Sequence, residues 1–172
     1  MSRRWALWLV FGLSFVAAGA LYAAMATLTL PALLAGPEAL RPFDVRPLGY
    51  DAAEARAYLA ALSQQGRATY LGLQQRLDFW FPAANALWMG AAVLLLFGGR
   101  VRFVLLAVIL AATLGDYSEN AAVAALLTAD PGTLSDATIA TANRFTLIKS
   151  LGTSLVWLAL LGGLFMAWRR RK

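Results

Sequence analysis

Four long apolar runs dominate the pattern of hydrophobic and polar residues along the chain. They cover residues 5–30, 79–98, 103–127 and 145–168. A helix needs roughly 20 apolar residues to cross the hydrocarbon core of a bilayer, so each run is long enough to span it. In the first run, small residues such as Gly12 and Gly19 are expected to let a neighbouring helix approach closely. The pattern predicts an all-α membrane protein, a bundle of four transmembrane helices in a single integral membrane domain, 1–172.

The longest polar stretch, residues 31–78, predicts a short helical cap outside the membrane between the first and second spans. Four prolines interrupt its first part, residues 31–50, and indicate irregular backbone there. Asp51 and Glu54 have the three-residue spacing of a capping box, which predicts the start of a helix. The apolar face of this helix consists of Ala55, Tyr58, Leu59 and Leu62.

A second short helix is expected at residues 67–77, because Gly66 is a natural stop for the first. Its apolar side carries Tyr70, Leu73 and Leu77. Amphipathic helices of this kind lie on the membrane surface or cover the outer end of a bundle. The second span then follows as a separate helix, with Pro82 in its first turn.

Composition and charge agree with a membrane location. Hydrophobic residues make up 60% of the chain and charged residues 14%, against about 45–50% and about 25% in soluble domains. The net charge is +6, yet the basic residues at the chain ends and in the 99–102 turn have no acid beside them: Arg3, Arg4, Arg100, Arg102, Arg169, Arg170, Arg171 and Lys172. This positive-inside pattern predicts a multi-pass protein of the cell inner membrane with both termini in the cytoplasm. It also explains the charge without nucleic acid as a partner.

The chain contains no Cys and no His. This excludes disulfides, Cys/His zinc sites, His-ligated haem and a Ser-His-Asp triad. Carboxylates, amides, hydroxyls, Lys, Arg and Tyr remain as the groups available for chemistry, and no cofactor is predicted.

The third run contains two acids, Asp116 and Glu119. Ionisable side chains inside a membrane are costly to bury, so they mark a candidate site. Counted from Phe103 at 1.5 Å per residue, they lie about 20 and about 24 Å along the helix, in the outer half of the bilayer. Asn120 shares their face, since residues three and four apart on a helix are neighbours.

The fourth run has a matching polar stripe at the same depth. Lys149 lies there with Thr146 and Ser150, and Arg144 is close to its outer end. Because the third and fourth runs are antiparallel and adjacent in sequence, the two stripes are expected to face each other. Further polar groups at this level are Asp78, Asn85 and Tyr117.

Two readings of this polar cluster remain open. In the first it is a pocket, in which Asp116 or Glu119 is the candidate base and Lys149 or Tyr117 the candidate acid, and the other polar residues bind a ligand. In the second it only fixes helix register, through hydrogen bonds worth about 0.6 kcal/mol each on average. Together with Asp78, these acids offer the oxygen ligands that Mg²⁺ or Ca²⁺ prefers, but Lys149 opposes a cation, so no metal is predicted.

The stretch Asp116-Tyr117-Ser118-Glu119-Asn120 resembles a pattern in bacterial four-span membrane proteins for which no activity is established. Gly66-Arg67 and a Leu77-Asp78 pair ahead of a Phe-Pro helix start belong to the same resemblance. It implies a common site at these residues and supplies no mechanism.

The favoured function is an intramembrane pocket that binds or acts on a lipid-like or small amphipathic molecule. The alternatives are a component of proton- or cation-coupled transport, and a non-catalytic scaffold or assembly subunit. Membrane lipids are the expected partners, with a homo-oligomer or a periplasmic or membrane protein as further candidates. The sequence alone leaves an enzyme and a binding protein equally open.

Overall fold

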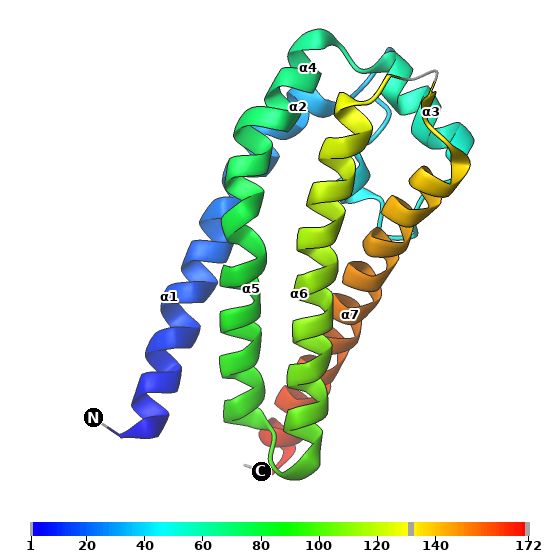
Figure 1. The fold of residues 1–172 in the computed structure, drawn as a ribbon. Coiled ribbons are helices and arrows are strands. Elements are labelled where there is room, and N and C mark those ends of the chain that lie inside the picture. Colours follow the sequence, from blue (N-terminus) through cyan, green and yellow to red (C-terminus); the bar gives the residue numbers. More distant parts are fainter. Residues whose placement is uncertain (1, 131–132, 171–172) are drawn as a thin grey trace.

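The computed structural model describes residues 2–130 and 133–170 and confirms the all-α bundle (Figure 1). Four helical runs are each long and apolar enough to cross a membrane, so the chain is a multi-pass membrane protein. They are Arg3–Leu33, Gln64–Leu96, Gly99–Thr128 and Asp136–Arg169. The second and fourth begin earlier than predicted, because the helices continue outward through polar sequence.

The helices pack in chain order. The first run contains α1 (Arg3–Ala24), the second α5 (Gln75–Leu96), and the last two are α6 (Gly99–Thr128) and α7 (Asp136–Arg169). Helix α1 packs along α5, α5 along α6, and α6 along α7. Both chain ends and the α5–α6 turn lie at one end of the bundle, and the cap lies at the other (Figure 1).

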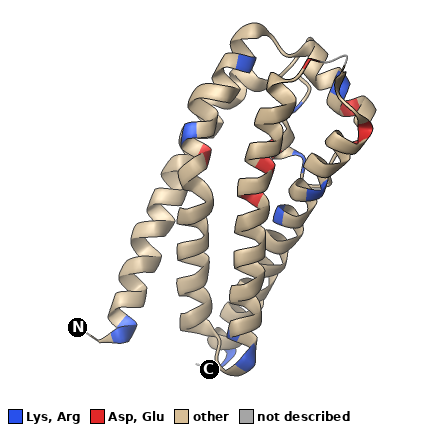
Figure 2. Ribbon diagram, in the orientation of Figure 1, with Lys and Arg blue, Asp and Glu red and all other residues tan. Residues whose placement is uncertain are grey.

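At the end that holds the termini the charged residues are all basic, whereas the outer half of the bundle and the cap carry both basic and acidic residues (Figure 2). Arg171 and Lys172, which belong to the predicted basic cluster, lie outside the described residues. The helices leave only residues 34–63 as the cap between the first two spans, shorter than the 31–78 expected.

The predicted helix at 67–77 is the outer end of the second membrane helix and not a separate element. The run consists of α4 (Gln64–Thr69), the π-helical segment η3 (Tyr70–Gln74) and α5. Gly66 does not stop a helix; it is buried inside α4, where the Ala32 carbonyl lies 2.6 Å from the position that a Cβ atom would take. Leu73, expected on the apolar side, is 43% exposed, since the wider π-helical turn changes the helical phase.

The first membrane helix is also interrupted by a π-helical segment. Helix α1 continues into η1 (Met25–Thr29) and then α2 (Leu30–Leu33). The expected close approach at Gly12 and Gly19 is wrong, because no atom lies within 4 Å of the Cβ position of either glycine. Buried Ala18 belongs instead to the apolar core that α1 shares with Trp88 of α5.

Pro82 lies inside α5 and not in its first turn. Proline has no N–H, so the Asp78 carbonyl one turn earlier lacks its helical donor. The Asn120 side-chain amide of α6 donates to this carbonyl at 3.5 Å. The Tyr117 hydroxyl donates to the next carbonyl, that of Phe79, at 3.1 Å. Two polar side chains of α6 therefore bind the backbone of α5 around the proline.

The cap contains a short 3-10 turn, η2 (Phe43–Val45), and helix α3 (Ala52–Ala61). The capping box of Asp51 and Glu54 is present as predicted. The predicted apolar face of α3 is buried in one core with Phe43 and with Leu126 of α6. This core holds η2 directly over the outer end of the bundle.

A tight backbone contact fixes the cap on α7. Gly49 has a φ of +83°, and a Cβ atom there would lie 2.3 Å from the Asn143 side-chain oxygen. That oxygen accepts a hydrogen bond from the Tyr50 N–H at 3.0 Å. Only glycine combines this conformation with this close approach.

Candidate functional site

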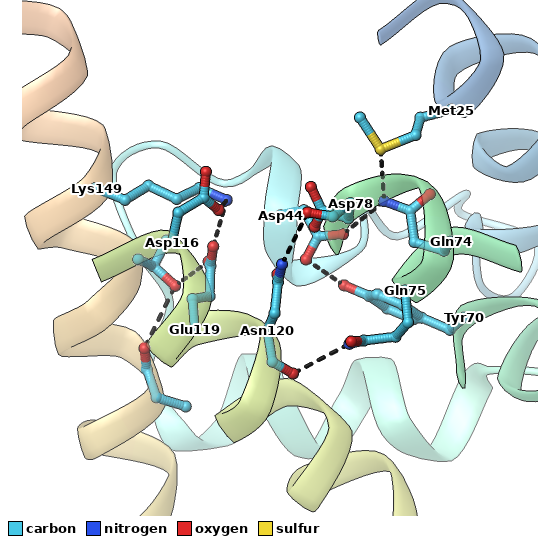
Figure 3. A network of polar contacts seen from close by, with 12 residues as sticks. Met25, Asp44, Tyr70, Gln74, Gln75, Asp78, Asp116, Glu119, Asn120 and Lys149 are labelled. Carbon is cyan, nitrogen blue, oxygen red and sulfur yellow. Dashed lines mark hydrogen bonds and ion pairs between the residues drawn. The ribbon is translucent and has the colours of Figure 1, made fainter. Parts of the chain in front are cut away.

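The two polar stripes of α6 and α7 face each other, and Lys149 joins them (Figure 3). Its ammonium lies 3.0 Å from Asp116 Oδ1 and also forms an ion pair with Glu119 Oε2. The Glu119 side chain is fully buried, and its other oxygen accepts a hydrogen bond from the Thr146 hydroxyl at 2.5 Å. All four side chains sit on two helices held at one depth.

Small residues allow this close pairing of α6 and α7. A Cβ atom at Gly115 would lie 3.2 Å from the Lys149 backbone nitrogen, and one at Gly152 would lie 2.8 Å from Ala112 Cβ. Because the helices approach this closely, the neighbouring Asp116 meets Lys149 directly. The close crossing of α6 and α7 thus brings the two side chains of this ion pair together.

A second polar group lies beside the first and includes residues that the sequence did not single out. The Asp44 carboxylate of η2 accepts hydrogen bonds from the Tyr70 hydroxyl at 2.8 Å and from the Gln74 amide at 3.1 Å. The Gln74 oxygen in turn accepts from the Thr29 hydroxyl at 2.5 Å. This group connects the cap with the π-helical segments of the first two spans.

Asp78 lies between these two groups. It is 5% exposed and faces the cavity described below. Within residues 2–130 and 133–170 its carboxylate forms no hydrogen bond or ion pair. It is the only carboxylate of the four in this region, among the described residues, that lacks such a partner.

A cavity of about 610 Å³ connects these groups. The charged and polar residues of its outer part, Asp44, Gln74, Asp78, Asp116, Lys149 and Ser150, lie among apolar residues of the first span and the cap, such as Leu30, Leu33, Pro42 and Val45. Its inner part is mostly apolar, with Phe15, Ala18, Gly19, Phe81, Trp88 and Trp157, and also contains Asn85, Thr153 and Ser154. All the charged residues of the cavity wall therefore lie in its outer part, and the rings of Phe15, Trp88 and Trp157 lie in its inner part.

The cavity opens sideways between the first and the last helix. Phe15 of α1 and Trp157 of α7 both line it, and they are 49% and 44% exposed. Tyr22 of α1, which also lines it, is 64% exposed. Because α1 packs on α5 and α7 on α6, the space between α1 and α7 faces the surroundings of the bundle.

The structure brings together only part of the predicted site. Asp78, Asn85 and Ser150 line the cavity. The Asn85 oxygen accepts a hydrogen bond from Trp88 Nε1 at 2.8 Å, which orients the indole on the apolar floor. Thr146 lies behind the ion pair, against Glu119.

Three predicted residues lie elsewhere or have other contacts. Asn120 and Tyr117 bind the backbone of α5 near Pro82, as described above. Arg144 is exposed on α7 and is absent from the cavity wall. The sequence predicted the depth of these three residues along their helices. Their contacts also depend on the rotation of each helix about its own axis.

Asp44, Gln74 and Thr29 were missed for identifiable reasons. Asp44 lies in the proline-rich segment, where no helical or strand periodicity predicts a direction. Gln74 and Thr29 lie in π-helical segments, whose phase differs from that of an α-helix. The one available signal was an acid directly after Phe43, in a segment otherwise poor in acids.

The region carries more negative than positive groups. Its four acids are Asp44, Asp78, Asp116 and Glu119, and its one cation is Lys149. Burial raises the pKa of the Asp44 carboxyl, and the Lys149 ammonium opposes this rise. In the described part of the chain, no group of three or more acidic side chains has the arrangement of a metal site.

Comparison with known proteins gives no relative: no family model, no curated protein and no solved structure matches this chain.

Proposed function

We propose that the protein binds an amphipathic, lipid-like molecule in this cavity, from the outer leaflet of an inner membrane. The observation that carries the proposal is the cavity wall, which is charged at its outer end, aromatic at its inner end and open between α1 and α7. A molecule with a polar head and an apolar tail matches this division. Ligand pockets of this size are typically apolar with a few convergent polar groups.

The tail of such a molecule would lie against Phe15, Trp88 and Trp157. These rings contact one another: Trp88 lies 5.5 Å from Phe15 and 5.0 Å from Trp157, between ring centroids. The head would reach the level of Asp116 and Asp78. A sideways opening allows entry from the membrane without passage of the tail through water.

Two features favour binding over acid–base catalysis. Glu119 is fully buried behind Lys149, so a ligand in the cavity does not reach it. Lys149 forms ion pairs with two carboxylates, so its ammonium is already engaged within the protein. Of the three candidate catalytic residues, Asp116 and Lys149 line the cavity, but they are already paired with each other.

Transport through a single copy is less favoured. Inward of the cavity, Val93, Ile109 and Val156 belong to an apolar core that fills the space between the helices. An ion or proton path through this core would lack polar groups to replace its water. The cavity is thus a site with one polar end, and not a pathway across the bundle.

Native mass spectrometry tests the proposal with a matched pair of variants. Gly19→Leu puts a larger side chain into the cavity, while Gly12→Leu makes the same change on α1 outside the cavity wall. We expect a lipid-sized mass to remain on the purified parent protein and on Gly12→Leu, and to be lost from Gly19→Leu. Equal retention by both variants, or no retained mass on the parent, would contradict the proposal.

A further inference from the structure

We propose that the head group of the bound molecule is an organic ammonium, held between Asp44 and Asp78. This inference rests on the proposed function and names the chemical class of the ligand. It follows from the charges of the cavity, from one carboxylate without a partner, and from the aromatic rings beside it.

The charge of the outer part of the cavity is not balanced by the protein. Lys149 forms ion pairs with Asp116 and Glu119, so its positive charge is already paired. Asp44 accepts hydrogen bonds only from neutral groups, a phenol and an amide. The Asp78 carboxylate forms no hydrogen bond or ion pair with the described residues. Two carboxylates therefore face the cavity without a cation of their own.

The nearest arginine in sequence does not supply that cation. Arg46 follows Asp44 by two residues, but its guanidinium donates to the Arg41 carbonyl at 2.7 and 2.9 Å. It also lies over the rings of Phe43 and Tyr58, at 5.8 and 5.5 Å from their centroids. The cap thus holds this arginine away from the Asp44 carboxylate.

Asp78 points to a ligand more directly than the acidic cluster does. Asp78 is only 5% exposed, and it lines the cavity. A buried carboxylate that lacks a partner is unfavourable, and a partner cation offsets much of that cost. Asp44 also lines this cavity, so its carboxylate and that of Asp78 border the same space.

Aromatic rings complete a site for an ammonium. Phe81 lies one turn inward of Asp78 and lines the cavity, and its ring centroid is 6.4 Å from that of Tyr22. Ammonium groups are attracted to the faces of such rings. An alkylammonium would place its nitrogen near the two carboxylates, its first carbons beside these rings, and its tail toward Trp88. A metal ion or a proton would leave this apolar part of the cavity unused.

The test compares amphiphiles that share one tail and differ in head charge. Protein purified in dodecyl maltoside is titrated with dodecyltrimethylammonium, with dodecylphosphocholine or with dodecanoate, and bound molecules are counted by native mass spectrometry. The neutral detergent is the reference competitor with the same tail. We expect dodecyltrimethylammonium to bind at a concentration at least about 10-fold lower than dodecanoate, as an unpaired carboxylate favours the cation.

Asp78→Asn should remove most of the preference for dodecyltrimethylammonium over dodecanoate. Asp51→Asn is the matched control, because Asp51 is an exposed helix cap away from the cavity and Asn also caps helices. If Asp78→Asn does not fold, as judged by its circular dichroism, Asp44→Asn provides the same comparison on the second carboxylate.

The outcomes separate this inference from the proposed function. Equal binding of all amphiphiles, still blocked by Gly19→Leu, would reject the ammonium and keep the amphipathic pocket. Preference for dodecanoate would also reject the ammonium. Binding that Gly19→Leu does not affect would reject both, while a preference lost in Asp78→Asn and kept in Asp51→Asn would support both.

Discussion

At the scale of single residues, Lys149 is the group on which the intramembrane charges depend. It forms ion pairs with two carboxylates at once, and Glu119 is fully buried behind it. Removing one partner of a buried ion pair is strongly destabilising, because the remaining charge keeps its desolvation cost without compensation. The buried ion pairs therefore predict which substitutions at Lys149 and Glu119 should lower the free energy of unfolding.

Lys149→Met should lower the free energy of unfolding by roughly 3–5 kcal/mol, as expected for a broken buried pair. Adding Glu119→Gln should recover part of this loss, since the amide removes the uncompensated charge and still accepts from Thr146. Thermal unfolding of the purified protein in detergent measures both effects. Losses that simply add in the double variant would mean that the two residues are not directly coupled.

At the scale of helices, Pro82 and Asn120 act as a pair. The proline removes a donor from α5, and the Asn120 amide of α6 supplies one to the same Asp78 carbonyl. Asn120→Ala should destabilise the protein by roughly 1–3 kcal/mol, the cost of an unsatisfied buried polar group. The measurement is again thermal unfolding.

The matching rescue is Pro82→Ala, which restores the N–H within α5. In that background Asn120→Ala should cost clearly less, because the carbonyl regains its helical donor. An equal cost in both backgrounds would show that Asn120 stabilises the bundle by another contact. One such contact is the hydrogen bond from Gln75 to the Asn120 backbone carbonyl.

The sequence predicted those parts of the site that lie on regular helices. The facing of Asp116 and Glu119 with Lys149 follows from the α-helical period and from the antiparallel order of adjacent spans. The position of Asp44 depends on a loop, which Gly49 and Phe43 fix by tertiary contacts that local pattern does not contain. The same limit applies to Gln74, because a π-helical turn leaves no periodic signal.

At the scale of the whole molecule, the charges of the two ends predict an orientation. Both termini and the α5–α6 turn share one end, where Arg100 and Arg102 lie. We expect this end in the cytoplasm and the cap outside. The chain contains no Cys, so single Cys residues can be introduced without background.

Ala60→Cys in the cap should react with a membrane-impermeant thiol reagent on intact cells, whereas Val101→Cys should react only after the cells are opened. Both positions are exposed in the folded chain, so burial does not protect either of them. The reverse labelling pattern would place the cap in the cytoplasm and would rule out entry of the ligand from the outer leaflet.

Because of the π-helical segment η3, the direction in which Asp78 points depends on the number of residues between Arg67 and Asp78. Arg67 donates hydrogen bonds to the Leu127 carbonyl of α6 and to the Leu59 carbonyl of the cap. These two bonds fix the rotation of the outer end of the second span about its helix axis. One residue more or fewer in a helix rotates everything beyond it by about 100°. The extra residue held in η3 is thus what allows Asp78 to face the cavity from a helix whose outer end faces the cap. In this chain, substitutions at the exposed Leu71 or Leu73 should therefore be tolerated far more readily than an insertion or deletion between them.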